Sequence, residues 1–119
     1  MPPADDLVEV HVTTPDRGVA MRLVRLLVER SLAACVQVVP GVTSVFAWEG
    51  AVEEDEEHLL LVKSTARRLG PIRDLVHAEH PYDTPEVLAV AVADCDPRYA
   101  DWLRETVRTA RRDVAAKDV

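Results

Sequence analysis

Hydrophobic and polar positions switch between two spacings along this chain, and the switches predict the order of its elements. Residues 7–13 are rich in β-branched side chains and alternate in part, which suits a strand. Between residues 19 and 27, leucine and valine recur every three or four positions, which predicts an amphipathic helix ending near Arg30. Thr14 is expected to cap this helix, with Pro15 at its first position. A strand should therefore lead directly into a helix.

The middle of the chain predicts a long β-hairpin. Residues 33–48 are typical of one strand that bends at residues 40–41, because the proline there cannot donate a ladder hydrogen bond and the glycine accommodates a bulge. After a turn at residues 49–50, residues 51–65 return. Their first half, with the acidic run 53–57, is expected in solvent and their second half in the core. Such strands far exceed the usual length of about five or six residues.

The last third predicts a helix, a strand and a second helix. The first helix spans about residues 66–79, and the Gly-Pro pair at 70–71 is expected to delay or break its first turn. The apolar run 87–93 is consistent with a strand buried on both faces. Asp96 and Pro97 then supply a cap and a first residue for a C-terminal helix.

The resulting order β-α-β-β-α-β-α contains the split βαβ arrangement of ferredoxin-like domains. The predicted fold class is therefore α+β: a ferredoxin-like βαββαβ sandwich with an extended β-hairpin and a C-terminal helix. A length of 119 residues has room for one domain, residues 1–119, which we expect to be ordered from about residue 7 to 112 with frayed ends.

Charge and cysteine content narrow the class of function. A net charge of -7 opposes binding to nucleic acid, whose affinity for proteins depends on clustered Lys and Arg. The same charge attracts cations without selecting among them. Cys35 and Cys95 form no C-x-x-C motif, and the sequence has neither the pattern of a signal peptide nor an apolar stretch of membrane-spanning length. These features predict a cytoplasmic protein with no nucleic-acid and no membrane partner.

Two dense motifs carry a family resemblance. They are Ser31-Leu32-Ala33-Ala34-Cys35-Val36-Gln37-Val38-Val39-Pro40-Gly41-Val42-Thr43-Ser44-Val45-Phe46-Ala47-Trp48-Glu49-Gly50 and His80-Pro81-Tyr82-Asp83-Thr84-Pro85-Glu86. Shorter blocks at residues 14–16, 61–65 and 99–102 follow in the same order. From about Val8 to Leu103 the chain thus resembles the CutA family, the divalent-cation tolerance proteins. The resemblance implies a PII-like homotrimer in which each hairpin extends the sheet of a neighbour.

The length of the hairpin independently points to assembly. A two-stranded ribbon on its own is marginal in water and exposes unpaired backbone groups, so a long one is expected to find another sheet edge. Its apolar residues would otherwise form a patch in water, and we expect them at the trimer interface: Val42, Val45, Phe46 and Trp48. The alternative is a floppy acidic ribbon.

Three residues are candidate metal ligands: His80, Cys35 and Glu79. His80 stands at a helix end, where an imidazole can equally cap the helix or bind a cation. Cys35 is more simply a small core side chain than a soft-metal ligand. In relatives with assigned copper ligands, the pattern is a cysteine before T-x-P-D and a His-His pair before Pro-Tyr. Only His80 carries over, since Val12 and Glu79 fill the other positions, so we expect weak binding of divalent ions rather than a copper-selective site.

The remaining polar or aromatic members of the family-like motifs are candidates for a ligand cleft: Lys63, Tyr82, Glu86 and Trp48. Lys63 closes an apolar strand and needs a counter-charge or access to solvent, and Glu86 is the expected partner. We interpret the set as an ion pair and packed aromatics at a subunit cleft, which could also hold a small anion or metabolite.

Signatures of catalysis are missing from the sequence, which has no G-x-S-x-G, H-E-x-x-H, Walker or G-x-G-x-x-G motif. The leading hypothesis is a homotrimeric CutA-like protein, not an enzyme, that takes part in divalent metal tolerance or response, possible ions including copper. It would bind metal or a small ligand at clefts between subunits. The alternatives are a PII-like signalling sensor or a trimeric scaffold without a direct metal role and, less favoured, an enzyme acting at the cleft.

Overall fold

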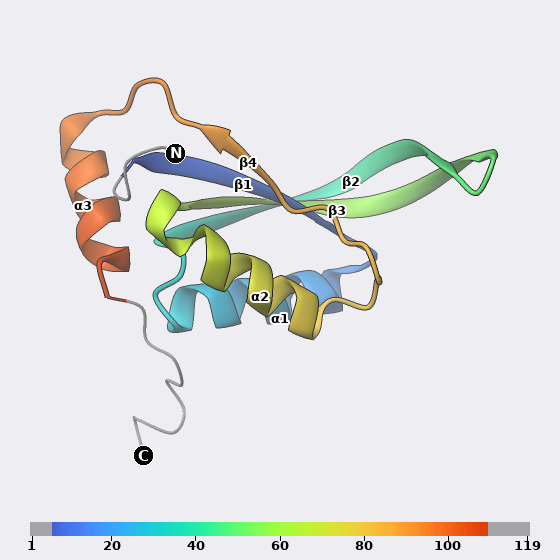
Figure 1. The fold of residues 1–119 in the computed structure, drawn as a ribbon, viewed down its shortest axis with the longest axis horizontal. Coiled ribbons are helices and arrows are strands. Elements are labelled where there is room, and N and C mark those ends of the chain that lie inside the picture. The colour runs from blue at the N-terminus through green and yellow to red at the C-terminus, as the bar shows by residue number, and fades with distance from the viewer. Residues whose placement is uncertain (1–5, 110–119) are drawn as a thin grey trace, which may run out of the picture.

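A four-stranded antiparallel sheet forms the centre of the computed structural model, which describes residues 6–109 (Figure 1). The strand order is β2-β3-β1-β4. The elements in chain order are β1 (Leu7–Thr14), α1 (Arg17–Glu29), β2 (Cys35–Trp48), β3 (Ala51–Thr65), a 3₁₀ turn η1 (Ala66–Arg68), α2 (Leu69–Glu79), β4 (Leu88–Ala91) and α3 (Pro97–Val107). The predicted ferredoxin-like α+β fold is confirmed. The expected fraying at the two ends concerns residues outside the described range.

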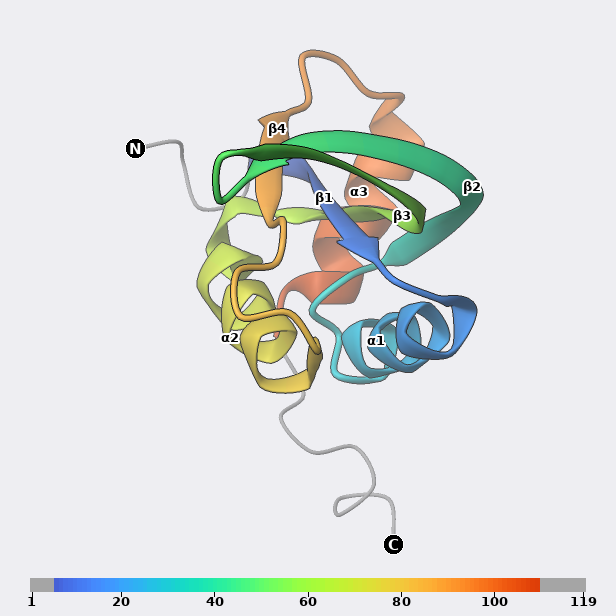
Figure 2. The same cartoon turned by 90° about the vertical axis from the view of Figure 1, so that its right-hand side faces the viewer.

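The main core lies between the sheet and the pair α1 and α2, which run side by side on one face (Figure 2). Alternate residues of β1, Val8, Val10 and Val12, point to this face and are buried, as period-two alternation requires. They meet the apolar stripes of the two helices, centred on Leu23 and Ile72. Each such side chain contributes about 1.5–3 kcal/mol when fully buried.

The opposite face of the sheet is covered only in part. Leu7 joins a second apolar cluster with residues of α3, among them Ala100 and Leu103. Further along β1, the residues that share this face with Leu7 are Glu9 and His11, which are half-buried. One face of the sheet is therefore an apolar core, and the other carries polar side chains beside α3.

The helix ends differ from the prediction in two places. Asp16, not Thr14, caps α1: its Oδ1 accepts a hydrogen bond from the backbone N–H of Val19 at 2.9 Å. Thr14 is instead the last residue of β1, where it is fully buried and its hydroxyl donates to the carbonyl of His58. The predicted delay before α2 is confirmed, because the 3₁₀ turn η1 precedes it. Asp96 caps α3 as predicted.

The hairpin formed by β2 and β3 projects beyond the rest of the sheet (Figure 1). Its register shifts between Val39 and Val42, which confirms the predicted bulge at residues 40–41. Glu49 and Gly50 both adopt positive φ, the geometry of a tight two-residue hairpin turn. Residues 51–56 are exposed as expected, but Glu57 is buried, so the prediction of a solvent-exposed acidic run was wrong at its last member.

The prediction for β4 was also wrong. We expected the apolar run 87–93 to be buried on both faces, yet all four residues of β4 are exposed in the single chain. β4 pairs only with β1 and so forms the edge of the sheet.

Among the described residues no helix is long and apolar enough to cross a membrane.

Candidate functional site

His80 is held by both of its ring nitrogens. It follows the last turn of α2, is only 7% exposed, and accepts a hydrogen bond from the backbone N–H of Tyr82 at Nδ1 over 3.1 Å. Nε2 therefore carries the proton and donates to the carbonyl of Thr13 at 2.7 Å. The ring joins α2, β1 and the segment after α2. A metal ion could reach either nitrogen only by breaking one of these hydrogen bonds.

The other two candidate ligands are not brought to His80. The carboxylate of Glu79 forms an ion pair with Arg22 of α1, at 2.7 Å. Cys35 lies in the cross-strand row of Lys63 and Glu9. His80 instead contacts Thr13, which is four residues beyond Glu9 on β1, so the backbone positions of Glu9 and Thr13 are ~13 Å apart. Residues 6–109 contain no group of three or more His, Cys, Asp or Glu side chains placed to hold a metal ion. Within residues 6–109 the donors of a single chain therefore do not fit a resident copper ion.

A row of charged side chains lies on the sheet face that α3 covers in part. Lys63 Nζ is 2.9 Å from Glu9 Oε1, and the other oxygen of that carboxylate is 2.7 Å from His11 Nε2. The expected pairing of Lys63 with Glu86 was wrong: Glu86 is exposed, while Glu9 stands directly opposite Lys63 in the ladder. We call Glu9, His11 and Lys63 the charged row.

Cys35 extends this row across β2, since it pairs with Lys63 in the register of the hairpin. Burial, together with the neighbouring Cys35 sulfur, raises the pKa of Tyr99 on α3 above its ordinary value. No motif in the sequence indicated the roles of Glu9, His11 or Tyr99. The only signal was that Lys63 needs a counter-charge, and its source depends on strand register.

The hydrogen bonds that Glu9 accepts from Lys63 and then from His11 hold its pKa below the ordinary 4.5. The stability that this carboxylate contributes is therefore fully present above pH ~4.5 and is lost as pH falls through the lower folded-state pKa. We expect Glu9→Gln to lower the free energy of unfolding at neutral pH, and by much less near pH ~2, in urea titrations. Glu86→Gln is the matched control and should show no such difference. An equal effect of Glu9→Gln at both pH values would contradict this assignment.

Tyr82 connects the segment after α2 to the hairpin. Its hydroxyl donates to Glu57 Oε2 at 3.2 Å, and its ring lies 4.7 Å from that of His80, centroid to centroid. Burial and the nearby Glu57 carboxylate raise the pKa of Tyr82. Glu57, which the sequence placed in solvent, is 6% exposed and supplies this contact. Tyr82 therefore anchors the base of the projecting hairpin.

The four predicted cleft residues do not share one cleft within the chain. Trp48 pairs with Ala51 at the hairpin tip, and Lys63 pairs with Cys35 at its base. The separation along β3 is twelve residues, or ~40 Å. Tyr82 contacts neither, since its hydroxyl is bound to Glu57. Only a second copy of the chain could bring Trp48 next to Lys63.

Large apolar side chains are exposed at the two free edges of the sheet. On the hairpin these are Val45 (63%), Phe46 (38%), Trp48 (54%) and Val52 (78%). On and beside β4 they are Leu88, Val90 and Val92. Val42, the fourth predicted interface residue, is half-buried and pairs with Glu57 just after the bulge. An exposed edge strand flanked by apolar side chains is the kind of surface that pairs with another chain.

Several known proteins are similar to this chain in sequence. A family model described as "CutA1 divalent ion tolerance protein" matches residues 8–106. A divalent-cation tolerance protein CutA of Thermus thermophilus is 47% identical over 96 residues, covering 81% of this chain and 93% of that protein. Protein CutA of Arabidopsis thaliana, described as chloroplastic, is 41% identical, and the match covers 83% of this chain but only 54% of that protein.

Solved structures agree with the sequence matches. A structure of the Thermus thermophilus divalent cation tolerance protein has a TM-score of 0.83 at 45% identity and covers 84% of this chain and 97% of its own. CutA1 of Oryza sativa has a TM-score of 0.84 at 38% identity, with 87% and 94% covered. On the matched motifs, the shared fold and these identities, the chain belongs to the CutA1 family of divalent ion tolerance proteins.

Proposed function

We propose that this chain acts in divalent-cation tolerance as a homotrimer that binds an ion or a small ligand at clefts between subunits and does not catalyse a reaction. The observation that carries the proposal is the pair of exposed apolar edges, one on the hairpin and one on β4. A projecting ribbon with half or more of Val45, Trp48 and Val52 in water is stable only if another surface covers it. A closed ring of three copies covers such edges without growing into a fibre.

The position of the charged row supports a ligand site between copies. Glu9, His11 and Lys63 lie on the sheet face that α3 leaves partly open, where a neighbouring hairpin would enclose them. Trp48 of one copy would then lie beside Lys63 of another, which brings together two of the four predicted cleft residues Lys63, Tyr82, Glu86 and Trp48. Lys63 and His11 offer hydrogen-bond donors on the two sides of one carboxylate, which suits a small anion or metabolite.

A divalent ion would need donors from more than one copy, because the candidate ligands His80 and Glu79 are engaged and the described residues of one chain form no group of three donors. Copper selectivity is not part of the proposal. The engagement of both His80 nitrogens favours, as a second candidate, a PII-like sensor or trimeric scaffold without a direct metal role.

Two measurements on the full chain test the proposal. Sedimentation equilibrium should give three times the chain mass at micromolar concentration, and a persistent monomer would overturn the assembly. Calorimetric titration with Cu²⁺, Zn²⁺ and Mn²⁺ should show binding that depends on that assembly. An intact trimer that binds none of these ions would favour the second candidate, a sensor or scaffold without a direct metal role.

We also place the chain in the cytoplasm, on its two free thiols, Cys35 and Cys95. Fractionation of cells that express it naturally is the measurement, and recovery with a periplasmic or organelle fraction would contradict this placement.

A further inference from the structure

A broad groove is lined by residues of α2 and α3, two helices that Figure 1 shows on the part of the molecule away from the hairpin tip. Its volume is about 1220 Å³, above the ~300–1,000 Å³ of ordinary small-molecule pockets. Its apolar lining residues include Leu32 and Leu75, which are buried, and Pro71, which is exposed. No residue of the hairpin or of β4 lines it. The groove is therefore separate from the surfaces used in the proposed trimer.

The lining is basic for so acidic a chain. It contains five arginines, namely Arg30, Arg67, Arg68, Arg104 and Arg108, and four acidic residues, namely Asp74, Glu79, Asp101 and Glu105. The formal charge of the lining is thus 5 − 4 = +1, against -7 for the whole chain. Two of the four carboxylates are already engaged, Glu79 by Arg22 from outside the groove and Glu105 by Arg108. The arginines come from three separate parts of the fold, so one ligand could contact several of them.

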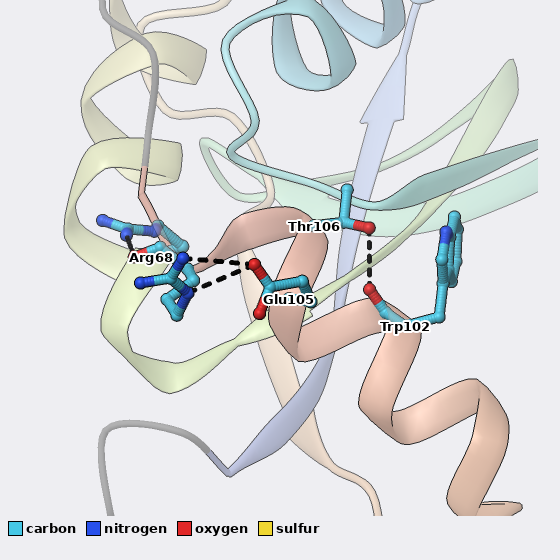
Figure 3. A network of polar contacts seen from close by, with 5 residues as sticks. Arg68, Trp102, Glu105 and Thr106 are labelled. Carbon is cyan, nitrogen blue, oxygen red and sulfur yellow. Dashed lines mark hydrogen bonds and ion pairs between the residues drawn. The ribbon is translucent and has the colours of Figure 1, made fainter.

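The walls of the groove are tied together. Arg68 Nε donates to the carbonyl of Val107 at 2.7 Å, and its Nη2 donates to the carbonyl of Arg108. Figure 3 shows Arg68 beside the end of α3, with Trp102 pointing away. The start of α2 is thereby fastened to the end of α3, and the spacing between the two walls is set before any ligand arrives. Because Nε and Nη2 of Arg68 donate to these carbonyls, Arg68 positions the walls, and the other arginines of the lining would contact a ligand.

We propose that this groove binds a small molecule with two or more linked phosphate groups. Guanidinium forks match phosphate oxygens in paired hydrogen bonds, and several forks around one groove suit several linked phosphates better than a single small anion. A nucleoside attached to the phosphates would contact the apolar lining residues Leu32, Pro71 and Leu75. The site goes beyond the tolerance function and does not depend on the trimer.

The test is calorimetric titration of the full chain with tripolyphosphate and with ATP in metal-free buffer. Arg30→Gln/Arg67→Gln should weaken binding of both by about tenfold or more, since each loses a charge-assisted hydrogen bond. Arg68 is left intact because it holds α3. The matched control, Arg25→Gln/Arg73→Gln, removes the same charge from exposed positions outside the groove and should change affinity by less than about twofold.

Asp101→Asn keeps the test informative if the arginine variant unfolds, because it should tighten binding of both probes by removing a repulsive carboxylate. Equal affinities for tripolyphosphate and ATP would support a site for the phosphate groups alone. Tighter binding of ATP would show that the apolar lining residues also contact the ligand. Absence of binding by the wild-type chain at millimolar probe, or equal losses in the groove and control variants, would overturn the proposal.

Discussion

Phe46→Glu/Trp48→Glu is expected to convert the proposed trimer into a monomer at micromolar concentration. Phe46 and Trp48 share one face of the hairpin and are exposed in the single chain, so their burial against a neighbour would supply much of the association energy. Buried interface aromatics commonly cost ~2 kcal/mol or more each when truncated, and a buried unpaired glutamate adds a desolvation penalty. Sedimentation equilibrium of the variant measures the result.

Two controls separate the causes of dissociation. Phe46 pairs with Glu53 across the hairpin, so a glutamate there also repels within the chain. Phe46→Ser/Trp48→Ser lacks that repulsion and should still weaken the assembly. Val28→Glu changes a side chain of similar exposure, 42% against 38% for Phe46, but on α1. A trimer that survives the hairpin variants and is lost in Val28→Glu would place the interface on the helices.

His80→Ala is expected to lower the free energy of unfolding by about 2–4 kcal/mol without weakening Cu²⁺ binding. The substitution leaves the carbonyl of Thr13 and the N–H of Tyr82 without their partner, and each buried unsatisfied group costs ~1–3 kcal/mol. It also removes the ring that packs on Tyr82. Urea unfolding followed by circular dichroism and calorimetric Cu²⁺ titration give the two readouts.

His77→Ala is the matched control for this second expectation. His77 lies on the same helix but is exposed, so its loss should change stability by no more than ~0.5 kcal/mol. A tight Cu²⁺ site that is lost in His80→Ala and kept in His77→Ala would show that the ring coordinates metal at the expense of its hydrogen bonds. An unchanged free energy of unfolding in His80→Ala would contradict the structural role assigned to the His80 ring.

Much of the fold could be predicted because the information is local. The spacing of Leu23, Leu26 and Leu27 predicts α1, and Asp96 before Pro97 predicts the start of α3. The proline at position 40 marks the bulge from sequence alone, since it cannot donate to a ladder. The cap of α1 was missed because two adjacent polar residues, Thr14 and Asp16, both suit that role. Strand β1 extends through Thr14, which leaves Asp16 as the cap.

The candidate site was less predictable, because its contacts join residues far apart in sequence. Lys63 was recognised as needing a counter-charge, but the register of β1 against β3 decides that Glu9 and not Glu86 supplies it. Glu57 belongs by composition to a solvated acidic run. It lies on β3 at the base of the projecting hairpin, however, where it is buried and accepts a hydrogen bond from the hydroxyl of Tyr82. A shift of the β3 register by one residue would turn the side chains of Lys63 and Glu57 to the other face of the sheet.

The sequence by itself determined the elements and their order, through hydrophobic period, caps and turn residues that act over a few positions. It also identified His80, through its position at a helix end, as either a cap or a ligand. Only the tertiary structure places the Thr13 carbonyl of β1 and the Tyr82 N–H on the two ring nitrogens, a bridging role that the sequence did not predict. It likewise decided that β4 is an exposed edge, and that arginines from α1, η1 and α3 line one groove. The physical reason is that burial and charge pairing depend on which segments meet in space, whereas periodicity depends only on the residue's own neighbours in the chain.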